Sequence, residues 1–252
     1  MNEQRVERAA ALLRSARRAV ALTGAGISTP SGIPDFRSPA SGLWEQADPM
    51  VVASIQGFRR NPQAFYDWLR PLVRQMLEAA PNPAHRALAG LEQNGLLRAV
   101  ITQNIDGLHQ RAGSRRVLEL HGHVRTATCV RCGSKVPAGP LIGQLVTSRE
   151  VPRCGRCGGA LKPDVVLFGE MLPGDVLEEA EKEAEACDVM LVAGSSLTVA
   201  PASLLPEMAL GHGARLVIVN RDPTDLDRAA EVVLHKDVAE ALPAIARACG
   251  AG

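Results

Sequence analysis

Residues 18–26 have the sequence Arg-Ala-Val-Ala-Leu-Thr-Gly-Ala-Gly, a short apolar run that ends in a glycine turn. Before this run, apolar side chains recur at helical spacing between charged residues, which predicts an amphipathic helix; they are Val6, Ala9, Ala10, Leu13 and Ala16. A helix, a buried strand and a glycine turn, in this order, indicate the beginning of an α/β domain.

Further short apolar runs extend this pattern along the chain, at residues 97–102, 189–193, 216–219 and 232–234. They are rich in β-branched residues and nearly continuous, which is typical of strands buried on both faces of a parallel sheet. Helical patterns at 84–94, 174–187 and 199–211 lie close to three of them. The alternation predicts an α/β fold of the Rossmann-like, doubly wound type.

Two stretches interrupt the alternation. Residues 30–76 hold several prolines and glycines and then a helical pattern, and residues 124–160 hold two cysteine pairs. We expect residues 1–29, 77–123 and 161–252 to form the sheet domain. The two insertions together predict a small second domain, in which 30–76 supplies helices and a mobile loop.

The composition excludes several classes of protein. Lys and Arg number 28 against 27 for Asp and Glu, so direct nucleic-acid binding through phosphate neutralisation is not indicated. Aromatic residues make up 3%, which argues against a base-stacking platform. The apolar runs are strand-length, far short of the ~20 residues of a spanning helix, and the first residues lack a signal-peptide pattern. We therefore expect a cytoplasmic protein without a membrane segment.

Four of the six cysteines form two Cys-x-x-Cys pairs, Cys129/Cys132 and Cys154/Cys157. In a reducing compartment this pattern favours a metal over disulfides. Two such turns complete a tetrahedral shell of thiolates, and four sulfur ligands leave no open position. The sequence predicts one structural Zn²⁺; two redox dithiols or unrelated cysteines are the alternatives.

The Gly24-Ala25-Gly26 turn after a strand is of the nucleotide-binding type, because glycines let the backbone approach a pyrophosphate. By itself the signal is weak. Thr29 occupies the place of the third glycine of a dehydrogenase fingerprint, and no acidic residue ends a second strand about 20 residues on. A bare strand–helix turn is the alternative.

The full run Gly24-Ala-Gly-Ile-Ser-Thr-Pro-Ser-Gly-Ile-Pro-Asp-Phe-Arg37 resembles the first motif of the sirtuins, the NAD-dependent protein lysine deacylases. The later sirtuin motifs follow in order: Thr102-Gln-Asn-Ile-Asp106, Leu120-His-Gly122, the two cysteine pairs, Phe168-Gly-Glu-Met-Leu-Pro173, Gly194-Ser-Ser-Leu197 and Val219-Asn220. The resemblance covers essentially residues 5–245.

This resemblance implies roles for particular residues. His121 is the expected catalytic general base, with Asn104 holding a water near the sugar, and His123 a bystander. The expected NAD contacts are Gly24, Ala25, Gly26, Thr29, Phe36, Arg37, Gln103, Asn104, Ile105, Asp106, His121, Gly194, Ser195, Ser196, Asn220 and Val238. Helix capping is the alternative for the polar residues at strand ends.

The resemblance further implies that acetylated proteins bind as extended peptides by strand addition. The expected peptide contacts are Val165, Leu167, Phe168, Gly169 and Val199, for which simple core packing is the alternative. The implied reaction is attack of the acyl-lysine carbonyl oxygen on C1′ of NAD, with loss of nicotinamide and formation of O-acetyl-ADP-ribose. Mono-ADP-ribosyl transfer or broader deacylation is the alternative within the family. A zinc-ribbon dehydrogenase and a zinc-ribbon interaction module are the alternatives outside it.

One helix bears on the acyl group. Desuccinylating sirtuins carry a Tyr-x-x-Arg pair on a helix of the small domain, whose arginine binds the acyl carboxylate. Here Tyr66 is followed three residues later by Leu69, and Arg70 lies about 100° further around the helix. An apolar Leu69 makes burial of an unpaired carboxylate costly. The sequence therefore predicts a preference for neutral acyl groups.

Overall fold

The computed structural model describes residues 3–36 and 42–251. The chain divides into two compact units, which we treat one at a time. Unit 1 comprises residues 1–31, 80–120 and 174–252, and unit 2 comprises residues 32–79 and 121–173.

A six-stranded parallel sheet forms the centre of unit 1, with the strand order β3-β2-β1-β7-β8-β9. The strands are β1 (Ala19–Thr23), β2 (Ala99–Thr102), β3 (Val117–Glu119), β7 (Val189–Ala193), β8 (Arg215–Val219) and β9 (Val232–Leu234). In the chain order of this unit the arrangement is 3-2-1-4-5-6, the doubly wound order of dinucleotide-binding folds. The order reverses between β1 and β7, and ligands of such sheets bind beyond the carboxyl ends of the strands at that point.

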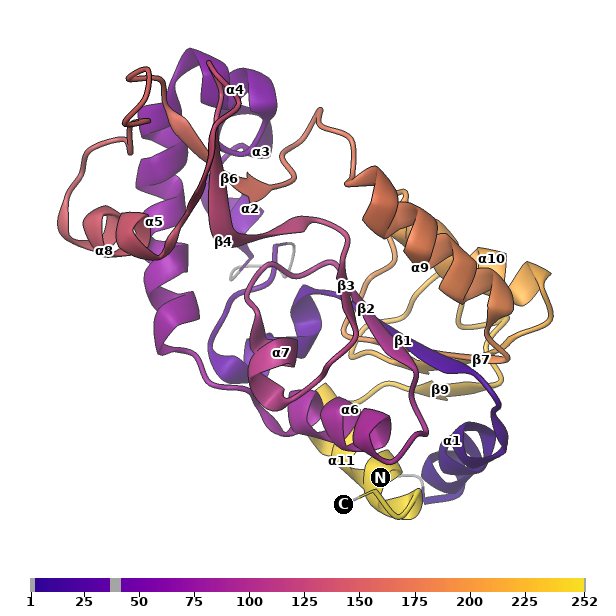
Figure 1. Ribbon diagram of the computed structural model, residues 1–252. Helices are drawn as coiled ribbons and strands as arrows, with labels where there is room; N and C mark the ends of the chain where they lie inside the picture. Colours follow the sequence, from indigo (N-terminus) through magenta and orange to yellow (C-terminus); the bar gives the residue numbers. More distant parts are fainter. Residues whose placement is uncertain (1–2, 37–41, 252) are drawn as a thin grey trace. The chain divides into compact units, whose positions relative to one another are not determined.

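Helices cover both faces of this sheet (Figure 1). On one face α1 (Glu3–Ser15), α6 (Pro83–Gln93) and α11 (Val238–Ala248) share a buried apolar cluster with the strands. The other face carries α9 (Gly174–Ala186) and α10 (Leu205–Gly211). The short helix α7 (Leu108–Ala112) follows β2. The 3₁₀ turns are η1 (Ala25–Ile27), η2 (Thr29–Ser31) and η3 (Ala202–Leu204). Strands β1 and β7 are buried along their whole length, because both faces are covered.

The amino ends of three neighbouring strands are held by one buried carboxylate. Glu183 of α9 has 2% of its side chain exposed. Its oxygens accept hydrogen bonds from Arg18 and Arg98 at 3.1 Å and pair with Arg116 at 2.6 Å. Each arginine lies next to the start of β1, β2 or β3. The Glu183 cluster thus lies at the amino ends of the strands, and the candidate site lies beyond their carboxyl ends.

Unit 2 contains a three-stranded antiparallel sheet in the order β5-β4-β6. The strands are β4 (Gly122–Cys129), β5 (Lys135–Pro137) and β6 (Leu161–Val165). Its helices are α2 (Leu43–Gln46), α3 (Pro49–Val52), α4 (Ile55–Arg60), α5 (Pro62–Glu78) and α8 (Gly139–Thr147). Asn61 caps α5 by accepting a bond from the Ala64 amide, and the Tyr66 hydroxyl donates to the Leu161 carbonyl at 2.6 Å, which ties the helix to β6.

The structure differs from the sequence-based expectation at the boundaries between the units. Residues 77–79 and 121–123, which we assigned to the sheet domain, lie in unit 2, and residues 30–31, which we assigned to the first insertion, lie in unit 1. Residues 161–173, which we assigned to the sheet domain, lie in unit 2, where β6 pairs with β4. The segment Val165–Gly169, expected as a strand, is strand only at Val165 and continues as a loop. The alternating pattern of β6 gives no indication of which sheet the strand joins, because that depends on its distant partner. Within residues 3–36 and 42–251, no helix has the length and apolar character needed to cross a membrane.

Candidate active site

Two glycine turns meet where the strand order of unit 1 reverses. Gly24 and Gly26 follow β1, and Gly194 follows β7. The Gly26 amide donates to the Gly194 carbonyl at 2.9 Å. A Cβ on Gly194 would lie 2.3 Å from the Ile27 nitrogen, and its φ of +61° also favours glycine. These expected NAD contacts therefore also serve a second purpose, since they let two loops pack backbone against backbone.

A buried hydrogen-bond network lies beside these turns and ends on the Asp106 carboxylate. The Ser28 hydroxyl donates to Asp106 at 2.6 Å, and the Asn104 amide donates to Ser28 Oγ and to the Gly24 carbonyl, both at 3.1 Å. The second Asp106 oxygen accepts from the Leu108 amide at 2.8 Å. Burial raises the pKa of Asp106, while the bonds from Ser28 and Leu108 oppose that rise. Asp106 thus accepts from the first amide of α7, whose N-cap is Gly107, and also anchors Asn104 through Ser28.

Two buried histidines extend the network. From the sequence, His109 is expected to have no role beyond that of a satisfied histidine, and His85 is not singled out. His85 and His109 pack edge to face with ring centroids 4.9 Å apart. His85 Nε2 lies 3.5 Å from Ser28 Oγ, and His109 Nε2 lies 2.9 Å from Thr23 Oγ. Burial lowers the pKa of His85 to about 4 and that of His109 to about 3, so both rings are neutral at pH 7. Asn82 and His85 form a capping box at the start of α6, and this local pattern is a sequence signal that could have drawn attention to His85.

The ends of the neighbouring strands carry further polar groups. Gln103 donates from Nε2 to Ser195 Oγ at 3.0 Å, which joins the ends of β2 and β7 across β1. Ser195 Oγ also accepts from the Leu197 amide at 3.3 Å. Asn220, after β8, donates to the Asp222 carbonyl at 2.8 Å. Hydroxyl and amide side chains of this kind suit ribose and phosphate groups, so the donor set at this edge fits a dinucleotide.

The other expected NAD and peptide contacts differ in how far they are exposed and in which unit they lie. Thr29 donates to the Gly26 carbonyl at 3.1 Å, and Val238 is a buried residue at the start of α11. Ser196 is exposed, whereas Ala25, Ile105 and Val199 are half-buried. Phe36 is half-buried and belongs to unit 2. Arg37, expected to contact the pyrophosphate, lies outside the described residues.

In unit 2, His121 lies immediately before β4. Its carbonyl accepts a hydrogen bond from the Val166 amide at 2.9 Å, so the expected base adjoins the expected peptide-binding segment. Gly122 makes this approach possible: its φ is +72°, and a Cβ there would lie 2.1 Å from the Asp164 carbonyl oxygen. The His-Gly step is therefore a packing requirement as well as a motif.

Backbone hydrogen bonds join the segment Val165–Gly169 to residues 53–55 of unit 2. The Phe168 amide donates to the Ala53 carbonyl at 2.9 Å, and the Phe168 carbonyl accepts from the Ile55 amide at 3.0 Å. Among the residues that the structure describes, neither the Val166 carbonyl nor the Gly169 amide has a hydrogen-bond partner. An unpaired carbonyl and an unpaired amide on one segment are what an added extended peptide requires.

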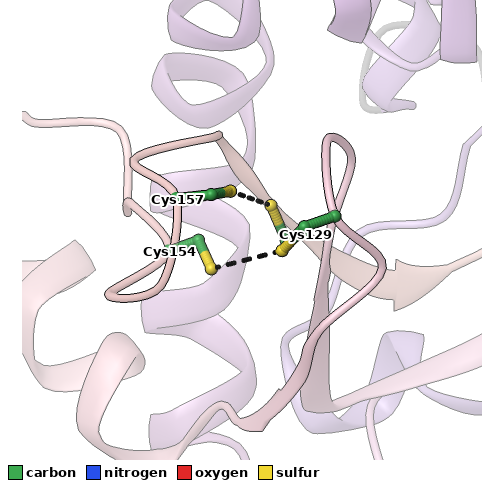
Figure 2. A group of neighbouring side chains, drawn as sticks. Cys129, Cys154 and Cys157 are labelled. Atoms are coloured by element: carbon green, nitrogen blue, oxygen red, sulfur yellow. Dashed lines mark hydrogen bonds between the residues drawn. The ribbon is translucent and has the colours of Figure 1, made fainter.

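The four paired cysteines of unit 2 converge on one point (Figure 2). All four Sγ atoms lie within 4.8 Å of one another, with Cys129 Sγ 3.5 Å from Cys157 Sγ and Cys132 Sγ 3.8 Å from Cys154 Sγ. A tetrahedral zinc with Zn–S bonds near 2.3 Å places its sulfurs about 3.8 Å apart. The thiolate cluster therefore fits Zn²⁺, and four ligands make the site structural.

These observations define a class: an α/β protein with a dinucleotide-binding sheet and a separate structural zinc unit. The chain belongs to the Sir2 family, whose model matches residues 24–201. An NAD-dependent protein deacetylase from Caldivirga maquilingensis is 49% identical over 93% of this chain and 90% of its own length. NAD-dependent protein deacylase 2 from Archaeoglobus fulgidus is 48% identical over 96% of this chain and 95% of its own.

Solved structures agree with this assignment. One, described as "Structural Basis for the Mechanism and Regulation of Sir2 Enzymes", has a TM-score of 0.93 at 47% identity and covers 98% of both chains. Another, described as "Sir2-p53 peptide-NAD+", has a TM-score of 0.88 at 45% identity and covers 96% of this chain and 97% of its own.

Proposed function

We propose that this protein is an NAD-dependent protein lysine deacetylase that transfers the acetyl group of acetyl-lysine to ADP-ribose. NAD, as co-substrate, supplies the sugar carbon from which nicotinamide leaves. The observation that carries the proposal is in unit 2, where the His121 carbonyl accepts from a segment whose Val166 carbonyl and Gly169 amide have no partner within residues 3–36 and 42–251. A base next to a receptor for extended peptide suits acyl transfer from a protein side chain.

The residues of unit 1 bind and orient the dinucleotide in this proposal. The turns at Gly24–Gly26 and Gly194–Ser196 lie at the point of sheet reversal and hold the phosphates and a ribose. Asp106 accepts from the nicotinamide amide, and Asn104 holds a water beside the sugar. The bonds from Ser28 and Asn104 fix these side chains before any ligand arrives, so little order is lost on binding.

His121 acts as general base on a ribose hydroxyl, because an imidazole has a pKa near the working pH. The proton moves from that hydroxyl to the ring, and the sugar oxygen can then attack the acyl carbon. The products are free lysine, nicotinamide and O-acetyl-ADP-ribose. Support comes from relatives named NAD-dependent protein deacetylase and from a Sir2 structure, 44% identical, described with a deacetylated p53 peptide and 3′-O-acetyl ADP-ribose.

The substrate binds as an extended peptide along Val165–Gly169, where the unpaired backbone groups accept and donate hydrogen bonds. Val199 contributes a second contact in the same proposal. Zn²⁺, held by Cys129, Cys132, Cys154 and Cys157, takes no part in the chemistry and ties the carboxyl end of β4 to the loop before β6.

The direct test incubates the protein with NAD and a peptide that carries one acetyl-lysine. Nicotinamide release that requires the acetylated peptide supports deacetylation, provided that mass spectrometry also finds O-acetyl-ADP-ribose and a peptide that has lost its acetyl group. Transfer of ADP-ribose onto a protein without loss of the acetyl group would favour mono-ADP-ribosyl transfer instead.

The acyl range also follows from unit 2. The Tyr66 hydroxyl is already bonded to the Leu161 carbonyl, and Leu69 is 1% exposed. The Arg70 guanidinium donates to the Leu145 carbonyl at 2.8 Å and pairs with Asp67 at 2.9 Å. The Tyr66 hydroxyl and two of the three Arg70 guanidinium nitrogens are thus engaged within unit 2, whereas Arg70 Nη2 is buried with no hydrogen-bond partner among the described residues. The apolar, buried Leu69 supports a preference for neutral acyl groups. Sir2 structures 43% identical to this chain are described with propionylated and myristoylated peptides, so longer neutral chains belong in the assay.

We expect kcat/KM for an acetyl-peptide to exceed that for the matched succinyl-peptide by about tenfold or more, because the apolar Leu69 stands at the position where desuccinylating sirtuins carry an arginine, and an unpaired carboxylate is costly to bury there. Equal values for the two peptides would contradict this expectation. Leu69→Arg should reduce the ratio of kcat/KM for the acetyl-peptide to kcat/KM for the succinyl-peptide. The thermal midpoint of the variant reports whether it remains folded.

We also propose that the protein works in the cytoplasm. The four clustered thiols must stay reduced to bind zinc, and a reducing compartment maintains that state. Fluorescence microscopy of a tagged full chain in its own cell would test this location.

A further inference from the structure

We propose that Lys162 and Glu170 form a clasp that aims the peptide-binding backbone of unit 2, so that both are positioning residues for the peptide substrate. The inference rests on the proposed function, since it concerns the segment assigned to the acetylated peptide. Lys162 lies in β6 and Glu170 in the loop that follows the segment Val165–Gly169.

The three protons of the Lys162 ammonium have three acceptors. Nζ lies 3.1 Å from the Pro163 carbonyl oxygen, 2.8 Å from that of Val165 and 3.0 Å from Glu170 Oε2. The side chain is 12% exposed, although a lysine side chain is ordinarily exposed. A mostly buried ammonium with every donor used is fixed in place, unlike a lysine in a surface ion pair.

Glu170 Oε2 accepts a second bond, from the Leu167 amide at 2.9 Å. The Glu170 amide in turn donates to the Leu167 carbonyl at 2.9 Å. The carboxylate therefore closes a ring from β6 through the peptide-binding segment and back to Lys162.

This contact sets the direction of the unpaired carbonyl. The Leu167 N–H and the Val166 C=O belong to one peptide unit, which is planar and trans, so they point in opposite directions. Glu170 holds the N–H, and the Val166 carbonyl must therefore point away from Glu170. The Val165–Val166 peptide unit is fixed as well, because Lys162 holds its carbonyl and the His121 carbonyl accepts from its amide.

The Gly169 amide is aimed by the same rule. Its peptide unit includes the Phe168 carbonyl, which accepts from the Ile55 amide at 3.0 Å. The two groups offered to the peptide are thus directed by one side-chain contact and one backbone contact. The Ile55–Phe168 bond joins two backbone groups, so a side-chain substitution does not remove it. The Glu170 side chain can be replaced, and its contact with the Leu167 amide is therefore the one to test.

The experiment measures steady-state kinetics of acetyl-peptide and NAD separately in Glu170→Ala. We expect KM for the peptide to rise about tenfold, the effect of one net hydrogen bond, while KM for NAD and kcat at saturating peptide change less than twofold. Glu170→Gln keeps one oxygen acceptor and should show an intermediate rise. Lys135→Met is the matched control, because its pair with Asp164 at 3.1 Å joins β5 to the same strand β6; peptide KM should stay at the wild-type value.

A charge swap separates aiming from simple ion-pair stability. Lys162→Glu combined with Glu170→Lys restores an ion pair, but a carboxylate at 162 cannot donate to the Val165 carbonyl and an ammonium at 170 cannot accept from the Leu167 amide. We expect the thermal midpoint to recover in part and peptide KM to stay high. Recovery of both would reduce the clasp to a stabilising pair and overturn the inference.

A Glu170→Ala variant with a lowered midpoint and unchanged peptide KM would overturn it too. Should Glu170→Ala fail to fold, Glu170→Gln decides, since its kinetics can still be compared with those of Lys135→Met. Failure of the proposed function gives a different result: the wild-type protein itself would then release no nicotinamide in response to acetyl-peptide.

Discussion

The two units organise their candidate functional groups by different means. Unit 1 uses side chains that are buried and bonded to one another, such as Ser28, Asn104 and Asp106, on top of a sheet with a full core. Unit 2 uses unpaired backbone groups, on a small sheet whose cluster of buried residues includes two zinc ligands. The difference suits the two substrates: a constant dinucleotide can be read by fixed side chains, whereas proteins of varied sequence share only their backbone.

The strongest challenge to this comparison is removal of zinc. Chelation, or Cys129→Ser, should unfold unit 2 and abolish activity, because structural zinc contributes on the order of 10 kcal/mol to the folding of small metal domains. Hydrogen exchange should show loss of protection in β4–β6 while β1 and β7 stay protected. Cys249→Ser, in unit 1 and outside the thiolate cluster, is the control. Zinc-free protein with full activity and intact protection would contradict the structural role.

His121→Ala tests the chemistry while leaving both units folded. We expect deacetylation to fall by about 10²–10⁴, the usual contribution of a general base, with unchanged zinc content and NAD binding. Single-turnover assays and calorimetric titration with NAD measure the two effects. Near-normal turnover would remove His121 from the mechanism and direct attention to His123.

Glu183→Gln should weaken unit 1 selectively. Burial opposes ionisation of Glu183, but its bonds to Arg18 and Arg98 and the charge of Arg116 outweigh that effect and hold its pKa below the ordinary value. Breaking this cluster should cost about 3 kcal/mol, the lower end of the range for buried pairs, since the arginines reach solvent. Urea unfolding followed by hydrogen exchange measures it.

The pH dependence of the unfolding free energy tests whether the contribution of Glu183 is ionic. A lowered carboxyl pKa stabilises the fold above the unfolded value of about 4.3, and that contribution is lost as the pH falls through the folded pKa. The gap between wild type and Glu183→Gln should therefore be constant from pH 7 to 5 and close in stronger acid. Glu178→Gln, which removes an exposed pair with Lys182 on the same helix, should have little effect. A gap that persists in strong acid would argue against an ionic origin.

The smallest expected effect concerns the buried histidines. The folded pKa of His109 is about 3 and its unfolded value about 6.5, so the unfolded chain takes up the proton first and stability falls as the pH drops below 6.5. His109→Gln should reduce the slope of unfolding free energy against pH by up to about 1.4 kcal/mol per pH unit between pH 6 and 4.5. Exposed His212→Gln is the control. An unchanged slope in His109→Gln would mean that the ring is not held neutral.

The sequence predicted the parallel sheet well, because strands such as β1 and β7 are buried on both faces and therefore consist of continuous apolar runs. It also predicted the metal cluster, since the ligands come in close pairs whose spacing reflects the coordination shell. Both signals are local in the chain, and local signals can be seen without a structure.

The polar network was not predicted, because its members come from separate segments. Ser28 meets His85 and Asp106 only after β1, α6 and β2 have packed, and nothing near any one of these residues indicates the others. The assignment of residues 161–173 has the same difficulty, since β6 is placed by pairing with β4 and by zinc ligands on both sides of a long connection. Contacts between residues that are far apart in the sequence have no local pattern by which they could be predicted.

The order of strands in unit 1 has a consequence for synthesis on the ribosome. Strand β1 lies between β2, which begins at Ala99, and β7, which begins only at Val189. Unit 2 is complete in the nascent chain at Pro173, before that residue is made. Because domains fold as units during translation, unit 2 should fold first, at a stage when β7, one of the two strands that pair with β1, has not yet been made. The later half of the sheet then completes a dinucleotide-binding edge whose first turn, at Gly24–Gly26, was translated before unit 2.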